Sequence, residues 1–123
     1  MTADKTNRLV PVRVPEQCIV RLRGQAILLD TDLAAIYGVA VKRLNQQVTR
    51  NPDRFPDDFC FQLSETEWRS LRLQNATSNG RGGRRSPPYA FTEHGAIMAA
   101  TVLNSPQAVQ MSVAVVRAFV KLR

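Results

Sequence analysis

The first clear pattern along the chain is a pair of short apolar runs. Residues 19–22 and 26–29 are rich in Ile, Leu and Val, and they flank Gly24 and Gln25. β-Branched residues on both sides of a Gly-X pair predict a tight hairpin, here with a type II′ turn. We therefore expect two antiparallel strands at the start of the domain, with Arg21 and Arg23 on their solvent side.

Two helices are expected directly after the hairpin. The short oxygen-bearing side chains of Asp30, Thr31 and Asp32 are each suited to cap the start of a helix. Gly38 is well placed to end that helix, because glycine readily adopts the left-handed conformation. A second helix is then expected at about 40–50, and the two together resemble a helix-turn-helix pair.

The second of these helices has one apolar and one polar face. Val41, Leu44 and Val48 recur at steps of three and four, which is the period of a single helix face. The opposite face carries amide, hydroxyl and cationic side chains: Lys42, Arg43, Asn45, Gln46, Thr49 and Arg50. Amides pair with adenine, and Lys or Arg pairs with guanine or phosphate. A solvated helix face would look the same, so the pattern alone leaves both interpretations open.

Short strands and helices alternate in the second half. Residues 59–63 alternate as a strand does, and the capping-box spacing of Ser64 and Glu67 predicts a helix after them. A brief strand at 89–91 leads to Thr92, the expected N-cap of the next helix. The whole pattern predicts an α+β fold, a single small domain with short β-hairpin strands packed on about five helices.

The last helix, starting at Pro106, is apolar around most of its circumference. Its apolar residues are Val109, Met111, Val113, Val115, Val116, Phe119, Val120 and Leu122. A helix of this kind is either wrapped by its own domain or buried against a second chain. Residues 106–123 are therefore a candidate homodimer interface.

Charge favours a polyanionic partner. The chain has 123 residues, with 17 Lys and Arg against 10 Asp and Glu, a formal charge of +7. Such an excess attracts nucleic acid through counterion release and electrostatic steering. We expect a flexible basic arm at 1–15 and one domain at 16–123. No apolar leader or membrane-length apolar run is present, so we expect a cytoplasmic protein without a membrane partner.

A second basic segment, "RGGRR" at 81–85, is also a candidate for DNA contact. Glycine lets a backbone approach phosphate closely, and Arg81, Arg84 and Arg85 offer forked donors for it. Viewed alone, the segment is equally compatible with a solubilising loop.

Enzyme chemistry finds little support. Glu93 and His94 are adjacent, so on a helix they diverge by about 100° and do not share a metal unaided. Asp57 and Asp58 fit a turn better than a nuclease pair. Cys18 and Cys60 have no zinc or disulfide spacing. We expect no enzyme, no cofactor and no metal.

Several motifs in the same order resemble the phage and bacterial open-reading-frame-six N-terminal domain family, a relative of the KilA-N domains. They are the segments "IVRLRGQAILLDTDLAAIYGVAVKRLNQQVTRNPDRF", "GGRRSPPYAFTEHGAIMAATVLNS" and "VRAFVKLR". The chain departs from the usual motifs at Gln46, Thr49 and His94. The resemblance covers residues 18–123 and implies a DNA-binding domain of phage or prophage regulators, often joined to a C-terminal effector module.

The leading hypothesis is a sequence-specific domain that binds double-stranded DNA, with the helix at about 40–50 in the major groove. The alternative is an antirepressor-type interaction module that binds a repressor through its apolar C-terminal helix. A basic face free of acids favours DNA, and a weak salt dependence of any DNA affinity would favour the protein partner.

Overall fold

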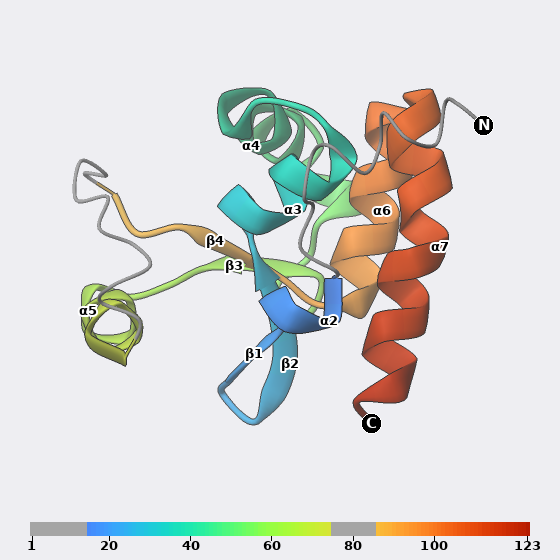
Figure 1. The fold of residues 1–123 in the computed structure, drawn as a ribbon. Helices are drawn as coiled ribbons and strands as arrows, with labels where there is room; N and C mark the ends of the chain where they lie inside the picture. Colours follow the sequence, from blue (N-terminus) through green and yellow to red (C-terminus); the bar gives the residue numbers. More distant parts are fainter. Residues whose placement is uncertain (1–14, 75–85) are drawn as a thin grey trace.

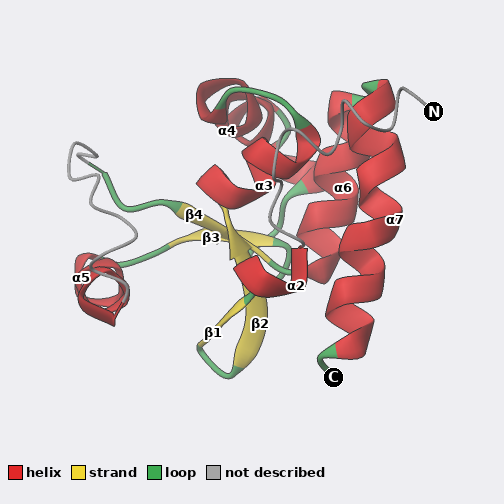
Figure 2. Cartoon of the chain, viewed as in Figure 1, coloured by secondary structure: helices red, strands yellow, loops and turns green. Residues whose placement is uncertain are grey.

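The computed structural model describes residues 15–74 and 86–123, and these form an α+β fold (Figures 1 and 2). The elements in chain order are α2 (Pro15–Cys18), β1 (Val20–Leu22), β2 (Gln25–Leu29), α3 (Asp30–Tyr37), α4 (Val41–Arg50), the 3-10 turn η1 (Pro52–Arg54), β3 (Cys60–Gln62), α5 (Glu65–Gln74), β4 (Tyr89–Phe91), α6 (Glu93–Leu103) and α7 (Pro106–Lys121). The predicted class is confirmed. The predicted arm lies outside the described residues, except for Pro15, which begins α2.

A four-stranded antiparallel sheet with the order β1-β2-β4-β3 organises the domain. Successive residues of each strand point to opposite faces, so the two faces pack against different helices. One face, with Leu28, Cys60 and Phe91, joins the core formed with α3, α4, α6 and α7. The other, with Ile27 and Ala90, packs with Leu63 and with Leu71 of α5. In Figure 1, α5 accordingly stands apart from the other helices.

Tyr37 ties the first helix of the predicted pair to the centre of the domain. Its side chain is fully buried, and its hydroxyl donates to the Ala96 carbonyl of α6 at 2.8 Å. Burial raises the pKa of the Tyr37 phenol, because the charged form would lose its hydration. Figure 1 shows α6 and α7 side by side, next to α3, so the pair is seated against the largest helices of the fold.

The hairpin turn differs from the prediction. Leu22 pairs with Gln25, so Arg23 and Gly24 are the central turn residues, with φ angles of 55° and 77°. Two positive φ angles define a type I′ turn, not the predicted type II′ turn on Gly24 and Gln25. The left-handed conformation of Arg23 is unfavourable for a non-glycine residue. Contacts of its guanidinium with α5, described below, offset this cost.

The start of α3 also differs from the prediction. The helix begins at Asp30 immediately after β2, so the N-cap position falls on Leu29, whose side chain makes no capping hydrogen bond. Asp30 is fully buried and directs its carboxylate toward other elements. None of the three candidate capping residues therefore occupies the N-cap position.

Three other local predictions are confirmed. Ser64 and Glu67 form a reciprocal capping box, with hydrogen bonds of 2.8 and 3.0 Å. Thr92 Oγ1 accepts from the Gly95 amide at the start of α6. Pro106 occupies the first turn of α7, whose N-cap is Ser105.

Candidate nucleic-acid interface

The turn between α3 and α4 is fixed by local hydrogen bonds. Gly38 has φ 73°, and its amide donates to the Ala35 carbonyl at 3.2 Å. The Val39 amide donates to the Ala34 carbonyl at 3.0 Å, which completes a Schellman motif. Residues 38–40 thus form a three-residue turn between two helices, as the helix-turn-helix pattern predicts.

The inner face of α4 holds the helix on the core. Leu44 is fully buried, whereas Val41 and Val48 are half-buried against the main core. The helix packs against α3 and α6. Its other side lies at the outer edge of the domain, at the top of Figure 1. The period of three and four in the sequence therefore correctly predicts which side of α4 faces inward.

Five of the six candidate residues on α4 lie away from the core or at its margin. Lys42, Arg43, Thr49 and Arg50 are exposed, and Gln46 is half-buried. At 100° per residue, Arg43, Gln46 and Arg50 fall within an arc of about 60°. The Thr49 hydroxyl donates to the Gln46 carbonyl at 3.1 Å, so it is engaged locally. Arg43, Gln46 and Arg50 form the middle of the outer face.

Asn45 is placed differently from the other candidates. It lies about 40° from Val41 around the helix, on the inner side. The side chain is half-buried, and Nδ2 donates to Oδ2 of the buried Asp30 at 2.9 Å. The structure therefore separates Asn45 from the outward-facing group.

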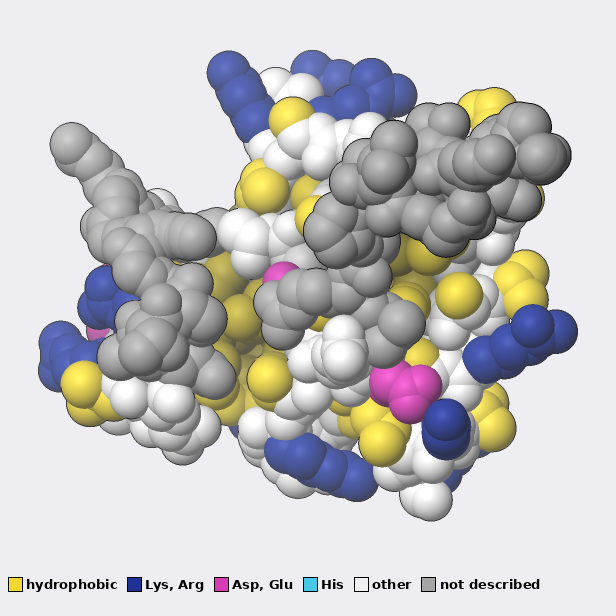
Figure 3. Space-filling model, in the orientation of Figure 1, with side chains coloured by type: hydrophobic (Ala, Val, Ile, Leu, Met, Phe, Trp, Pro, Cys, Tyr) yellow, Lys and Arg dark blue, Asp and Glu magenta, His cyan; other side chains and the backbone are white. Residues whose placement is uncertain are grey.

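A group of positive charges lies over α4, at the top of the molecule. Figure 3 shows Lys and Arg side chains gathered over α4, without Asp or Glu among them on this face. No acid occurs between Asp32 and Asp53 in the sequence. Asp53 itself is exposed in η1, so the acid-free surface ends just past the C-terminus of α4.

Two residues beside this surface were not anticipated from the sequence. Arg54 is exposed in η1, and its guanidinium lies 3.9 Å from the Met98 sulfur of α6. Gln47 is half-buried, and its carbonyl and side-chain oxygens accept from Nδ2 of Asn51 at 2.8 and 3.3 Å. In the sequence, Arg54 stands out only as a cation two residues after Pro52, the proline that ends the helix.

The second basic candidate lies outside the described residues. Arg81, Arg84 and Arg85 fall within 75–85, between the end of α5 and Ser86. Their part in an interface stays a prediction.

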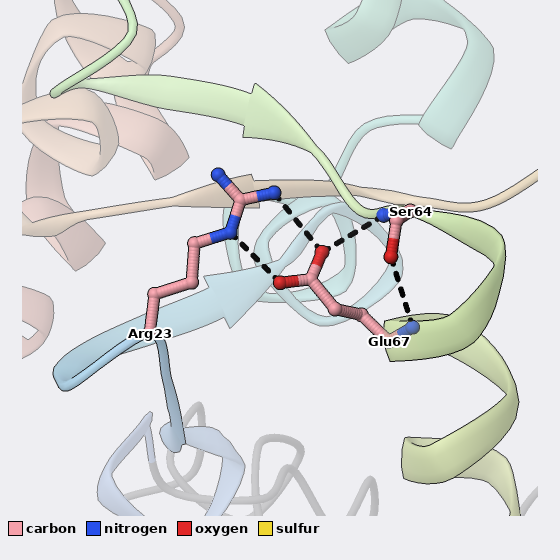
Figure 4. A network of polar contacts seen from close by, with 3 residues as sticks. All are labelled: Arg23, Ser64 and Glu67. Carbon is pink, nitrogen blue, oxygen red and sulfur yellow. Dashed lines mark hydrogen bonds and ion pairs between the residues drawn. The ribbon is translucent and has the colours of Figure 1, made fainter.

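Arg23 connects the hairpin to the start of α5 (Figure 4). Its Nε and Nη2 donate to the two carboxylate oxygens of Glu67 at 2.8 and 3.0 Å. The guanidinium also lies 4.1 Å from the centre of the Phe61 ring. Glu67 is at the same time half of the capping box with Ser64. Arg23 thus serves the packing of α5, and the sequence pattern did not show this.

This network predicts a specific loss of stability in acid. The hydrogen bonds from Arg23 and from the Ser64 amide lower the pKa of Glu67 from 4.5 to about 2. Because the folded pKa lies below the unfolded value, the contribution is complete above pH 4.5 and is lost as the pH falls toward 2. Glu67→Gln keeps a capping side chain but does not titrate. As the pH falls from 4.5 toward 2, we expect the free energy of unfolding of Glu67→Gln to decrease less steeply than that of the wild type. Urea denaturation at a series of pH values measures this free energy.

Glu65→Gln provides the control, because it removes a charge from the exposed first turn of the same helix. Equal pH slopes for the wild type and Glu67→Gln would show that the Arg23–Glu67 pair makes no pH-dependent contribution.

The residues considered for catalysis have structural contacts. The His94 ring stacks on Phe59 with centroids 5.4 Å apart, and Glu93 pairs with Arg123. The Asp58 carbonyl accepts from Thr92 Oγ1 at 2.9 Å. Within residues 15–74 and 86–123, no three His, Cys, Asp or Glu side chains gather in a way that would hold a metal ion. No helix in the same residues is long and apolar enough to cross a membrane.

Comparison with known proteins gave one match. The family model of the ORF6N domain matches residues 17–102, which include the sheet, the α3–α4 pair and nearly all of α6. The searches of curated proteins and of solved structures returned no match.

Proposed function

Because the chain belongs to the ORF6N domain family, we propose that it is a sequence-specific DNA-binding domain of a phage-type or prophage-type transcriptional regulator or antirepressor. The observation that carries the proposal is the outer face of α4. An exposed, acid-free face with cations and an amide stands on a helix whose other face is anchored in the core. The major groove of B-DNA is wide enough to admit such a helix.

The side chains divide naturally into two roles. Arg43 and Gln46 stand near the middle of the face, with the donors and acceptors that pair with guanine and adenine edges. Lys42 and Arg50 lie beyond these two residues, toward the two ends of α4, and offer charge to phosphates. Asn45 is left out of the reading group because it bonds to Asp30. Arg81, Arg84 and Arg85 remain proposed phosphate contacts.

The salt dependence of DNA binding tests the proposal against the protein-partner alternative. Each neutralised phosphate contributes about −0.9 to the slope of log affinity against log salt. With Lys42 and Arg50 on phosphates, we expect affinity for duplex DNA to fall at least about 10-fold between 50 and 200 mM salt. Fluorescence anisotropy with a labelled duplex measures this fall. A flat salt dependence would favour binding to a repressor protein.

A second role, in protein docking, is favoured by the solvent side of α7. Val109, Val113 and Val120 are each 51% exposed, and Val116 is half-buried between them. Figure 3 shows apolar side chains uncovered on this flank. These four valines, which we call the valine stripe, are spaced four, three and four residues apart. This spacing aligns them along one side of the helix, as in the contact between two paired helices.

A second copy of the chain would pair with the valine stripe in an antiparallel arrangement. Such a pair sets Val109 beside Val120 of the partner subunit. It brings Arg117 toward Gln110 of the partner subunit, so that no two like charges meet along that edge of the seam. We propose that α7 forms a homodimer in this way, which would give the DNA-binding unit two-fold symmetry.

Sedimentation at increasing protein concentration tests the homodimer. We expect the wild type to approach the mass of a dimer and Val113→Glu to remain monomeric, because a buried unpaired carboxylate opposes association. Thermal unfolding of dilute Val113→Glu should match the dilute wild type, since the side chain is exposed in the single chain. Gln74→Glu, which adds one carboxylate at the exposed end of α5 and away from α7, is the matched control. A wild type that stays monomeric would contradict the homodimer and leave the valine stripe to a different partner.

A further inference from the structure

Asp30 occupies the point where the sheet, α3 and α4 meet. It is fully buried and is the first residue of α3, directly after the last residue of β2. Leu29 pairs with Ala90, so the next pair of the ladder would be Asp30 with Tyr89. The backbone has already turned into the helix there, and the Tyr89 amide instead donates to Oδ2 of Asp30 at 3.1 Å. The carboxylate therefore replaces a strand carbonyl.

The same oxygen holds α4. Asn45 Nδ2 donates to Oδ2 of Asp30 at 2.9 Å, from the middle of the helix. The orientation of the amide is determined, because a flipped amide would set its oxygen against the carboxylate. Asn45 Oδ1 is buried and accepts no hydrogen bond from the residues that the structure describes. The Asn45 side chain therefore keeps its hydrogen bond to Asp30 even though its own oxygen is buried without a donor. This indicates that the role of the Asn45 side chain is the bond to Asp30.

The remaining contacts of α4 control its rotation less tightly. Leu44 is fully buried, but Val41 and Val48 are only partly so. Apolar contacts are non-directional, whereas a hydrogen bond between buried polar groups selects one registry. A rotation of about 20° moves a group ~6 Å from the helix axis by about 2 Å. Such a displacement separates a donor from the base edge it should reach.

We propose that Asn45 is a positioning residue and not a base-reading residue. Its bond to Asp30 sets the rotation of α4 on the sheet and thereby aims Arg43 and Gln46. This inference rests on the proposed DNA-reading function of α4. The hydrogen bond between Asn45 and Asp30, which we call the tether, involves no DNA. It is therefore also testable in the unbound protein.

Four variants of the full chain, compared with the wild type, test the proposal. Asn45→Ala and Asp30→Ala each remove the tether, and the double variant completes a cycle. Asp30→Asn keeps an oxygen that accepts both hydrogen bonds, so it is the conservative rescue. Affinity for the preferred duplex and for unrelated duplex is measured at one salt concentration. Amide hydrogen exchange is measured without DNA.

We expect Asn45→Ala and Asp30→Ala each to lower affinity for the preferred duplex by about 10-fold, the scale of one misplaced base contact. The double variant should lose little more, because both changes break the same bond. Affinity for unrelated DNA should change less than about twofold, since no cation is removed. Asp30→Asn should stay near the wild type.

Hydrogen exchange distinguishes the two ends of the tether. Both alanine variants should speed exchange along α4, whereas only Asp30→Ala should speed exchange of the Tyr89 amide. Two results would overturn the proposal. One is that Asn45→Ala loses its sequence preference at a single base position of the preferred duplex while Asp30→Ala binds that duplex as the wild type does. The other is unchanged α4 exchange in both alanine variants. A wild type without any preferred duplex overturns the proposed function instead, and exchange still tests the tether.

Discussion

Replacing Arg43 or Gln46 by alanine is expected to lower affinity for the preferred duplex by about 5- to 150-fold, the equivalent of 1–3 kcal/mol for a lost bidentate base contact. Both side chains stand on the outer face of α4; around the helix, Gln46 lies about 160° from the buried Leu44 and Arg43 about 100°. Affinity for unrelated DNA should fall much less, because base contacts are formed only with the correct sequence. Competition binding with preferred and scrambled duplexes measures the two affinities.

Arg21→Ala is the matched control for these variants. Arg21 is an exposed cation on β1, which lies away from α4 in Figure 1, and its loss changes net charge by the same amount as Arg43→Ala. We expect its ratio of specific to non-specific affinity to equal that of the wild type. Equal losses on preferred and scrambled DNA for Arg43→Ala and Gln46→Ala would contradict the assignment of α4 as the reading helix.

Gly95→Ala is expected to cost more than about 3 kcal/mol of unfolding free energy, beyond the usual range for overpacking. A Cβ atom at Gly95 would lie 1.8 Å from the Phe59 carbonyl oxygen, a backbone atom. That carbonyl accepts from the Thr92 amide at 3.0 Å and from Thr92 Oγ1 at 3.2 Å. Either α6 or the segment before β3 must move. Small domains are stable by only about 5–15 kcal/mol, so urea denaturation should show a large shift of the midpoint.

Gly24→Ala separates packing from backbone effects. Gly24 has a positive φ, which costs an alanine roughly 1–2 kcal/mol, but a Cβ atom at this position would meet no heavy atom within 4 Å beyond its chain neighbours. Gly95 lies in the first turn of α6 without a positive φ, so a helical backbone there would by itself favour alanine. If Gly95→Ala unfolds no more readily than Gly24→Ala, the close contact with Phe59 does not constrain the fold.

Sequence reasoning succeeded where the determinants are local. The spacing of Val41, Leu44 and Val48 specifies which face of α4 is buried, because helical periodicity depends on neighbours within a few turns. The capping box at Ser64 and the left-handed Gly38 are likewise properties of adjacent residues. The α+β class follows from such elements, and it was predicted correctly.

The failures share a physical cause, which is a partner far away in the sequence. Asp30 looked like a helix cap, but its carboxylate bonds to Asn45 and to the Tyr89 amide, 59 residues away. Arg23 adopts a positive φ while it bonds to Glu67, 44 residues away. Asn45 had the chemistry of a base reader, and only the folded chain shows what it bonds. Side-chain type predicted the composition of the candidate interface, but not which members face outward.

Selection of bound sequences from random duplex DNA, at near-physiological salt, tests the central claim most directly. Performed with the wild type and with Gln46→Ala in parallel, it reports sequence preference and its dependence on α4. The wild type should enrich a defined motif, and Gln46→Ala should lose the preference at one base position of that motif while keeping the rest. If the wild type enriches no motif, or if Gln46→Ala enriches the identical motif with equal strength, α4 does not read DNA in the way proposed.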